Sequence, residues 1–421
     1  MMTAQDEHTD QNWTETESMK DHNMNATVPF FRRILRVLRI VVLALVILIA
    51  AGYLWASLST ETSLTARGIM WGDSQADDWK RYPSRSVLAS DTPVYFDTEE
   101  TDMFDDFTIE NQPLSEYLES SNTTAFIILH DNVLLYEGYF NGSSHEATQA
   151  SLSVAKSFTS TLVGIAIDDG FIGSLDDPIT TYIPELLERD ARFGDITLRH
   201  LITMSSGLRF VRDKSNPFSD DFITYASPDL RAAALDSEIV EAPGMRFHYN
   251  DYNPQLLGII LERVTGMSVS KYFESHLWGP MGAEGEGSWD LDSERSGFEK
   301  MSVGVNGRAI DFAKLGWLFL HDGKNGERQV VPIAWVEQAT RPDRSTHRPD
   351  QAYGYSWWVD LDRDGFNAEG DFCQFIYVYR PADLVLVRHG SDCGGVYWTG
   401  LLGEMAQAIE AELNLHVMNE E

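Results

Sequence analysis

A serine and a lysine three residues apart form the pair whose spacing best supports catalysis in this 421-residue chain. Ser153 and Lys156 open an apolar stretch, residues 151–167, that we expect to be a buried helix. Side chains three residues apart share one helical face and can touch. The positive end of the helix dipole and burial both disfavour a proton on Lys156. A neutral lysine can accept the serine proton, so the pair predicts a nucleophilic serine.

A second pair with the same spacing is Ser268 and Lys271. Ser268 comes soon after Gly266 and is typical of the residue that caps the start of a helix. Capping explains this pair and leaves Lys271 in solvent, so we do not expect it to be catalytic.

The sequence resembles the serine β-lactamase and penicillin-binding-protein superfamily, in particular its class C branch of esterases and 6-aminohexanoate-oligomer hydrolases. The resemblance covers about residues 110 to 415, with the motifs in family order. It rests on Ser153 and Lys156, on Pro243-Gly244, Phe247, Tyr249, Leu256-Leu257-Gly258 and Thr265-Gly266, and on the stretches Ile196 to Leu208 and Gly307 to Lys324.

The family's second motif is Tyr-x-Asn, and Tyr249 stands at its tyrosine. The resemblance implies that the phenol relays protons between nucleophile and leaving group. A neighbouring lysine can lower the pKa of a tyrosine, which suits this role. Asp251 stands where the family usually has asparagine. Its carboxylate could hold Lys156 protonated or could hydrogen-bond Tyr249, and the sequence leaves both open.

The family's third motif, Lys/His-Thr-Gly, is missing, and its nearest match is Ala368-Glu369-Gly370. The cation that grips a substrate carboxylate in β-lactamases is therefore absent, which argues against penicillin-like substrates. Gly370 either allows close backbone approach or is an ordinary strand-end glycine. We expect the main-chain N–H groups of Ser153 and Asp371 to form the oxyanion hole.

Hairpin and helix patterns around these motifs predict an α+β fold. Two β-rich runs between Ala125 and Phe140 form one expected hairpin, and residues 374–379 and 384–389 form another. Helical segments lie between them, and a final helix covers residues 401–413. The expected architecture is an antiparallel sheet flanked by helices, with a mostly helical insert, preceded by one transmembrane helix.

The two cysteines, Cys373 and Cys393, lie near the open end of the second hairpin. A turn at residues 380–383 puts Cys373 opposite about Ser391, only two residues from Cys393. This register predicts a disulfide. Two separate buried thiols are the alternative.

An uncharged apolar run from Ile40 to Leu58 is long enough to cross a bilayer, at roughly 28 Å. Four arginines just before it predict a cytoplasmic N-terminus and a periplasmic or extracellular catalytic domain. A cleaved signal peptide is the alternative. The expected organisation is a disordered acidic tail at 1–28, a basic flank and anchor at 29–58, a lead-in segment at 59–109 and a hydrolase domain at 110–421.

The chain carries 65 acidic and 32 basic residues, and its net charge of −33 disfavours nucleic acid binding. No histidine pattern typical of metal sites occurs, and we expect no cofactor. Gly72-Asp73-Ser74 begins another hydrolase signature, but the Asp-x-x-His that it requires is missing. We therefore expect a membrane-anchored serine hydrolase that acts on a small ester, amide or peptide. A binding or sensor domain without turnover is the alternative.

Overall fold

The computed structural model describes residues 14–98, 102–213, 216, 218–342 and 352–420. The chain divides into two compact units, residues 1–60 and residues 61–421. The lead-in segment expected at 59–109 therefore belongs, from residue 61 on, to the same unit as residues 110–421.

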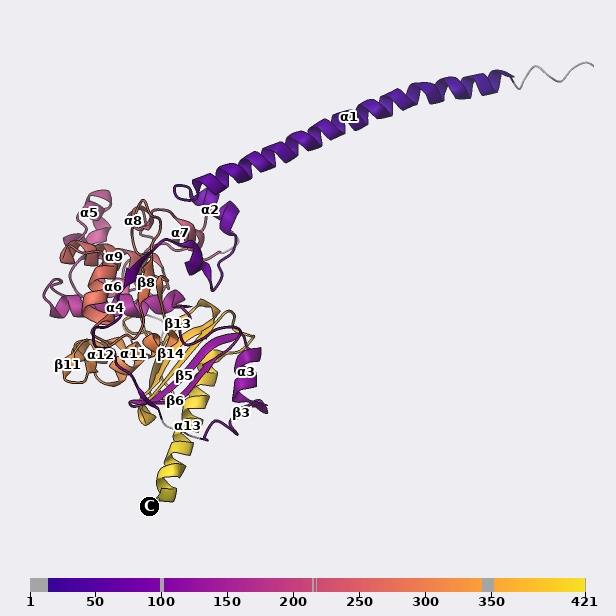
Figure 1. The fold of residues 1–421 in the computed structure, drawn as a ribbon. Coiled ribbons are helices and arrows are strands. Elements are labelled where there is room, and N and C mark those ends of the chain that lie inside the picture. Colours follow the sequence, from indigo (N-terminus) through magenta and orange to yellow (C-terminus); the bar gives the residue numbers. More distant parts are fainter. Residues whose placement is uncertain (1–13, 99–101, 214–215, 217, 343–351, 421) are drawn as a thin grey trace, which may run out of the picture. The chain divides into compact units, whose positions relative to one another are not determined.

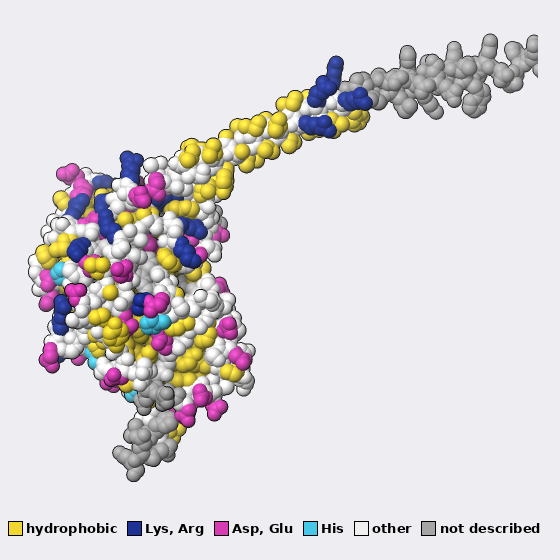
Figure 2. Space-filling model, viewed as in Figure 1, with side chains coloured by type: hydrophobic (Ala, Val, Ile, Leu, Met, Phe, Trp, Pro, Cys, Tyr) yellow, Lys and Arg dark blue, Asp and Glu magenta, His cyan; other side chains and the backbone are white. Residues whose placement is uncertain are grey.

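The first unit contains one long helix, α1 (Thr14–Ser59). Its portion Phe31–Ser59 is long and apolar enough to cross a membrane. Figure 2 shows basic side chains gathered at the start of this apolar surface. The helix begins inside the segment that the sequence predicts to be disordered, because extending an existing helix avoids the unfavourable nucleation step. Residues 1–13 of that segment lie outside the described residues.

The second unit is built on a seven-stranded sheet in the order β12-β13-β14-β15-β5-β6-β2 (Figure 1). Neighbouring strands are antiparallel except β2 and β6. Both predicted hairpins are present, as the pairs β5–β6 and β14–β15. The strands are β2 (Asp97–Thr98), β5 (Thr123–His130), β6 (Val133–Tyr139), β12 (Trp358–Asp360), β13 (Gly365–Gly370), β14 (Gln374–Tyr379) and β15 (Leu384–Gly390).

Alternation along β5 divides the core of this unit into two layers. Ala125, Ile127 and Leu129 pack in one cluster, and Phe126 and Ile128 pack in the other. This period of two is the one that a strand buried on both faces requires. The first layer is closed by α4 (Ala155–Asp168) and α11 (Ala309–Leu320), and the second by α3 (Leu114–Ser120) and α13 (Trp398–Glu420) (Figure 1).

The helical part lies between the two hairpins, as predicted, and a second sheet has the order β1-β8-β9-β7. The helices of this helical part are α5 (Glu185–Arg189), α6 (Leu198–Ile202), α7 (Asp220–Ala226), α8 (Leu230–Leu235), α9 (Tyr252–Thr265), α10 (Val269–Phe273) and a π-helical turn Glu274–Trp278. The second sheet contains β1 (Ser84–Val87), β7 (Gln149–Ala150), β8 (Gly287–Asp290) and β9 (Val305–Gly307). Remaining elements are α2 (Leu64–Trp71), α12 (Ile333–Ala339), and the short pairs β3 (Thr108–Ile109) with β4 (Gln112–Pro113) and β10 (Lys324–Asn325) with β11 (Arg328–Gln329).

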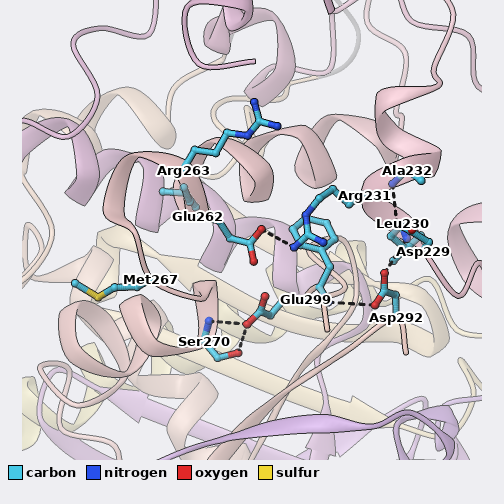
Figure 3. Close-up of polar contacts among 12 residues, drawn as sticks. Asp229, Leu230, Arg231, Ala232, Glu262, Arg263, Met267, Ser270, Asp292 and Glu299 are labelled. Atoms are coloured by element: carbon cyan, nitrogen blue, oxygen red, sulfur yellow. Dashed lines mark hydrogen bonds and ion pairs between the residues drawn. The ribbon is translucent and has the colours of Figure 1, made fainter. Parts of the chain in front are cut away.

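Buried carboxylates tie the helical part together (Figure 3). Glu299 is fully buried and accepts hydrogen bonds from the backbone N–H and hydroxyl of Ser270, at 3.1 and 2.7 Å. Arg85 of β1 donates to the same carboxylate at 2.6 Å. Arg231 of α8 pairs with Glu262 of α9 at 2.7 Å. These partners offset the desolvation of the buried charges and fix how the helices pack.

The lead-in segment is built into this unit rather than lying loosely on it. β1 pairs with β8, and β2 pairs with β6. Arg67 is fully buried and donates hydrogen bonds to the carbonyl oxygens of Ser227 and Asp292, at 3.1 and 2.5 Å. A buried guanidinium without such acceptors would be strongly destabilising, so these contacts hold the segment in place.

The second hairpin has the predicted register, with Phe375 opposite Arg388. Cys373 and Cys393 form a disulfide, with 5.2 Å between their Cα atoms. The predicted bridge is therefore confirmed, and the alternative of two separate thiols is wrong.

Candidate active site

Ser153 lies at the point where the chain enters the buried helix α4. The residues Leu152–Val154 form a 3₁₀ turn, and the α-helix follows from Ala155. Leu152 has a φ of 45°, in the left-handed region that bulky side chains rarely adopt. Strain of this kind persists only where the surrounding fold enforces it. It turns the backbone so that Ser153, which is partly exposed, faces a pocket.

Lys156 is 1% exposed and contacts the nucleophile candidate directly. Its side-chain nitrogen Nζ lies 2.8 Å from Ser153 Oγ and donates to the carbonyl of Ser302 at 3.1 Å. It also lies 2.9 Å from Asp251 Oδ1. The structure thus brings together the serine and lysine that the sequence singled out. Of the two partners left open for Asp251, the carboxylate contacts the lysine.

Tyr249 stands in the loop before α9 and hydrogen-bonds Ser153. Burial raises the pKa of its phenol well above the ordinary value, and the charge of Asp251 raises it further. The hydrogen bond with Ser153 and the charge of Arg212 act in the opposite direction but are smaller. The expectation of a lowered pKa is therefore wrong, because burial outweighs the cationic neighbours. At neutral pH this tyrosine is a phenol, which can donate a proton.

An aromatic cluster holds the Tyr249 ring in place. Trp358 stacks on it at 6.0 Å between ring centres with an angle of 13°, and Tyr353 meets it edge-on at 6.2 Å. Two basic side chains lie over the ring: Lys156 Nζ and the guanidinium carbon of Arg212 are each 4.8 Å from its centre. The ring therefore has little freedom to move away from the serine.

Gly370 ends β13 directly against the backbone of Ser151 and Ser153. A Cβ atom added there would lie 2.6 Å from the carbonyl oxygen of Ser151 and 3.0 Å from the nitrogen of Ser153. The close backbone approach considered for this glycine is thus present. Asp371 follows, and both Phe372 and Cys373 have positive φ values, so the chain turns away sharply.

The variant Gly370→Ala is expected to lower kcat/KM for ester hydrolysis at least about tenfold. Its methyl group would push β13 away from Ser151 and Ser153, and overpacking of this kind costs about 1–3 kcal/mol. Gly194→Ala is the matched control, because its added Cβ would meet only Leu187 at an ordinary 3.4 Å. Steady-state kinetics on both variants make the comparison. Full activity in Gly370→Ala would show that the strand need not touch the nucleophile.

The pocket in front of Ser153 has a volume of about 450 Å³. It is lined by Ser153, Arg212, Phe247, His248, Tyr249, Trp358, residues 369–373 and Cys393. A smaller hollow of about 100 Å³ lies on another side of the site, between residues 72–82 of the lead-in and residues that include Asp251 and Ser302. Ser74 lines this hollow as a loop residue.

The second serine–lysine pair serves the helix cap that the sequence predicts. The Ser268 side chain accepts a hydrogen bond from the backbone N–H of Lys271, whose side chain is 63% exposed.

His389 lies on β15, where burial lowers the pKa of its imidazole to about 3. Among the residues that the structure describes, no group of three His, Cys, Asp or Glu side chains could hold a metal ion.

Sequence reasoning missed three residues of the site. Arg212 belongs to the loop between α6 and α7, Ser302 contributes only its carbonyl oxygen, and Trp358 begins the edge strand β12. No motif marks any of them, because each reaches the site through the packing of distant segments.

A family model described as Beta-lactamase matches residues 114–391. A curated relative, 6-aminohexanoate-dimer hydrolase of Paenarthrobacter ureafaciens, is 25% identical over 324 residues, or 71% of this chain and 81% of the relative.

Solved structures show the same fold. A putative 6-aminohexanoate-dimer hydrolase from Bacillus anthracis has a TM-score of 0.71 at 22% identity, over 81% of this chain and 94% of that one. A putative beta-lactamase from Bacteroides dorei has a TM-score of 0.59 at 18% identity, over 71% and 97%.

Proposed function

Because this chain belongs to the Beta-lactamase family, we propose that it is a serine hydrolase that cleaves an amide or ester bond through an acyl-enzyme on Ser153. The observation that carries the proposal is the contact of 2.8 Å between Lys156 Nζ and Ser153 Oγ, at the mouth of a pocket. A buried base in contact with an accessible hydroxyl is the arrangement that activates a serine.

In the first half-reaction the Ser153 oxygen bonds to the substrate carbonyl carbon, and its proton passes to neutral Lys156. The carboxylate of Asp251, 2.9 Å away, stabilises the ammonium that forms. The carbonyl oxygen becomes an oxyanion, and the main-chain N–H groups of Ser153 and Asp371 are its proposed donors. The close contact of Gly370 with Ser153 supports this pair, because it brings the two backbones together.

The intermediate then expels its leaving group, as the bond from carbonyl carbon to nitrogen or oxygen breaks. The leaving atom takes a proton from the Tyr249 phenol, which Lys156 reprotonates. The raised pKa of Tyr249 supports this direction of transfer, since the resting group is the acid. Water then attacks the acyl-enzyme by the reverse proton path, which releases the acid product and restores Ser153.

The substrate class proposed for this chain is small esters, short amides or peptides. The relative named 6-aminohexanoate-dimer hydrolase supports a small dimeric or oligomeric substrate. The site uses no cofactor in this scheme, and nucleic acid is not among the proposed partners.

We also propose that Phe31–Ser59 of α1 is an uncleaved single-pass anchor, with the N-terminus in the cytoplasm and residues 61–421 in the periplasm or outside the cell. The length and apolar character of this segment support the anchor. The basic residues that precede it support the orientation.

A sensor domain that becomes acylated without turnover is the second candidate. The departures from the family motifs at Asp251 and at Ala368-Glu369-Gly370 favour it. Release of product from a simple ester separates the two functions, because a sensor would stop at the acyl-enzyme.

The proposal is tested by incubating the full chain, in detergent, with activated esters, β-lactams and a fluorophosphonate. Mass spectrometry of the digested protein is expected to show the adduct on the peptide that contains Ser153, together with turnover of at least one ester. An adduct on another serine would contradict the assignment. A stable Ser153 adduct with no turnover of any ester would favour the sensor.

A further inference from the structure

Arg212 is an exposed cation in the wall of the catalytic pocket. Among the described residues it forms no ion pair, although the chain is strongly acidic. Two other arginines of the helical part are paired with carboxylates: Arg209 lies 3.4 Å from Asp220, and Arg246 lies 2.6 Å from Glu241. An arginine that lies beside the proposed nucleophile and pairs with no carboxylate can offer the parallel N–H donors of its guanidinium group to a ligand.

The contacts of Arg212 place it on the tyrosine side of the pocket. Its guanidinium carbon lies 4.8 Å from the centre of the Tyr249 ring, and Tyr249 hydrogen-bonds Ser153. The strand side of the same pocket carries acidic residues instead, because Glu369 and Asp371 flank Gly370 there. The pocket therefore presents a cation beside the tyrosine and carboxylates beside the strand.

We propose that Arg212 binds a carboxylate carried by the leaving group of the substrate. This inference rests on the proposed function, in which Tyr249 gives its proton to the leaving atom. A leaving group whose reacting atom contacts Tyr249 extends from there toward Arg212. The guanidinium group of Arg212 can donate two parallel hydrogen bonds to a carboxylate. Glu369 and Asp371 repel a carboxylate from the strand side, so that only one orientation is favourable. The substrate class is an ester or amide whose leaving group is a hydroxy acid or an amino acid with a free carboxylate.

This position differs from that of the cation in the family's third motif, which the sequence lacks. The missing motif argued against penicillin-like substrates, whereas Arg212 supplies a cation from the loop between α6 and α7. The carboxylate is thereby gripped beside Tyr249 rather than beside Gly370.

Two esters with the same acetyl group test the inference. The leaving group of 4-acetoxybenzoate carries a carboxylate, and that of 4-acetoxybenzamide is its neutral counterpart. Arg212→Gln is expected to lower kcat/KM about tenfold on the benzoate, mainly through KM, since the neutral glutamine cannot form the charge-assisted, two-pronged hydrogen bond that arginine forms with a carboxylate. Activity on the benzamide should stay within about twofold. Arg246→Gln, which removes an exposed arginine outside the pocket, should change neither.

Equal losses on both esters would overturn the inference, because Arg212 would then act through Tyr249 and not on the substrate. Unchanged activity on both would overturn it as well. A third ester, mono-4-nitrophenyl glutarate, carries its carboxylate on the acyl side. A loss confined to that ester would also contradict the assignment to the leaving group.

A binding measurement separates this inference from the proposed function. Ser153→Ala leaves 4-acetoxybenzoate uncleaved, and ligand-observed NMR is expected to show about tenfold weaker binding when Arg212→Gln is added. Failure of ester turnover in the native chain would contradict the proposed function alone. Equal binding of 4-acetoxybenzoate by Ser153→Ala and by the double variant with Arg212→Gln would contradict the role of Arg212 alone.

Discussion

Replacing Ser153 by alanine is expected to lower ester hydrolysis at least about a thousandfold while the fold persists. The hydroxyl is the only group removed, and the buried Lys156 keeps its contacts with the Ser302 carbonyl and with Asp251. Steady-state kinetics and a thermal unfolding midpoint within a few degrees of the native protein check the two halves of this expectation.

The chain offers a matched control at Ser268, which belongs to the second serine–lysine pair. Its side chain caps α10, so that Ser268→Ala removes about 1 kcal/mol of stability and leaves turnover intact. Retention of more than a few per cent of activity by Ser153→Ala would place the nucleophile elsewhere. Loss of activity in Ser268→Ala would show that the spacing alone had misidentified the site.

Lys156→Ala and Tyr249→Phe are each expected to lower the acylation rate at least about a hundredfold, the usual scale for loss of a general acid or base. Both side chains contact Ser153, and in the proposed scheme the leaving-group proton passes from one to the other. The double variant should therefore lose little more than the worse single variant. Stopped-flow measurement of the first turnover gives the acylation rates.

Tyr353→Phe is the control for the tyrosine, because Tyr353 packs edge-on against the Tyr249 ring and its own ring stays in place in this variant. Its acylation rate should change less than about threefold. Losses that add fully in the double variant would contradict a shared proton path. A large loss in Tyr353→Phe would mean that the aromatic cluster, and not the phenol, controls the rate.

Local signals in the sequence were sufficient to predict the contact of Ser153 with Lys156 and the two hairpins. Residues 151–156 lie within one or two helical turns, so their spacing fixes the contact of Ser153 with Lys156. The hairpin of β14 and β15 has a short turn, which sets its register and thereby the pairing of Cys373 with Cys393. In each case the residues that meet are close in sequence or joined by one turn.

Long-range packing decided the features that the sequence could not predict. The pKa of Tyr249 depends on how deeply the ring is buried between Trp358 and Lys156, which no neighbouring residue reveals. Arg212 reaches the pocket from a loop without a motif. The lead-in segment, expected only as a stretch before the domain, supplies strands β1 and β2, because pairing with β8 and β6 satisfies backbone groups that short isolated runs leave open.

The bridge between Cys373 and Cys393 makes the shape of the pocket depend on the surroundings in which the chain matures. Both cysteines line the pocket, and Cys373 comes two residues after the proposed oxyanion donor Asp371. A chain produced in the reducing cytosol of an expression host lacks this covalent link, and the turn beside the nucleophile loses one of its restraints. Poor activity of such material would reflect where the protein was made rather than what its catalytic residues can do. Material folded in an oxidising compartment is therefore the proper starting point for every kinetic comparison at this site.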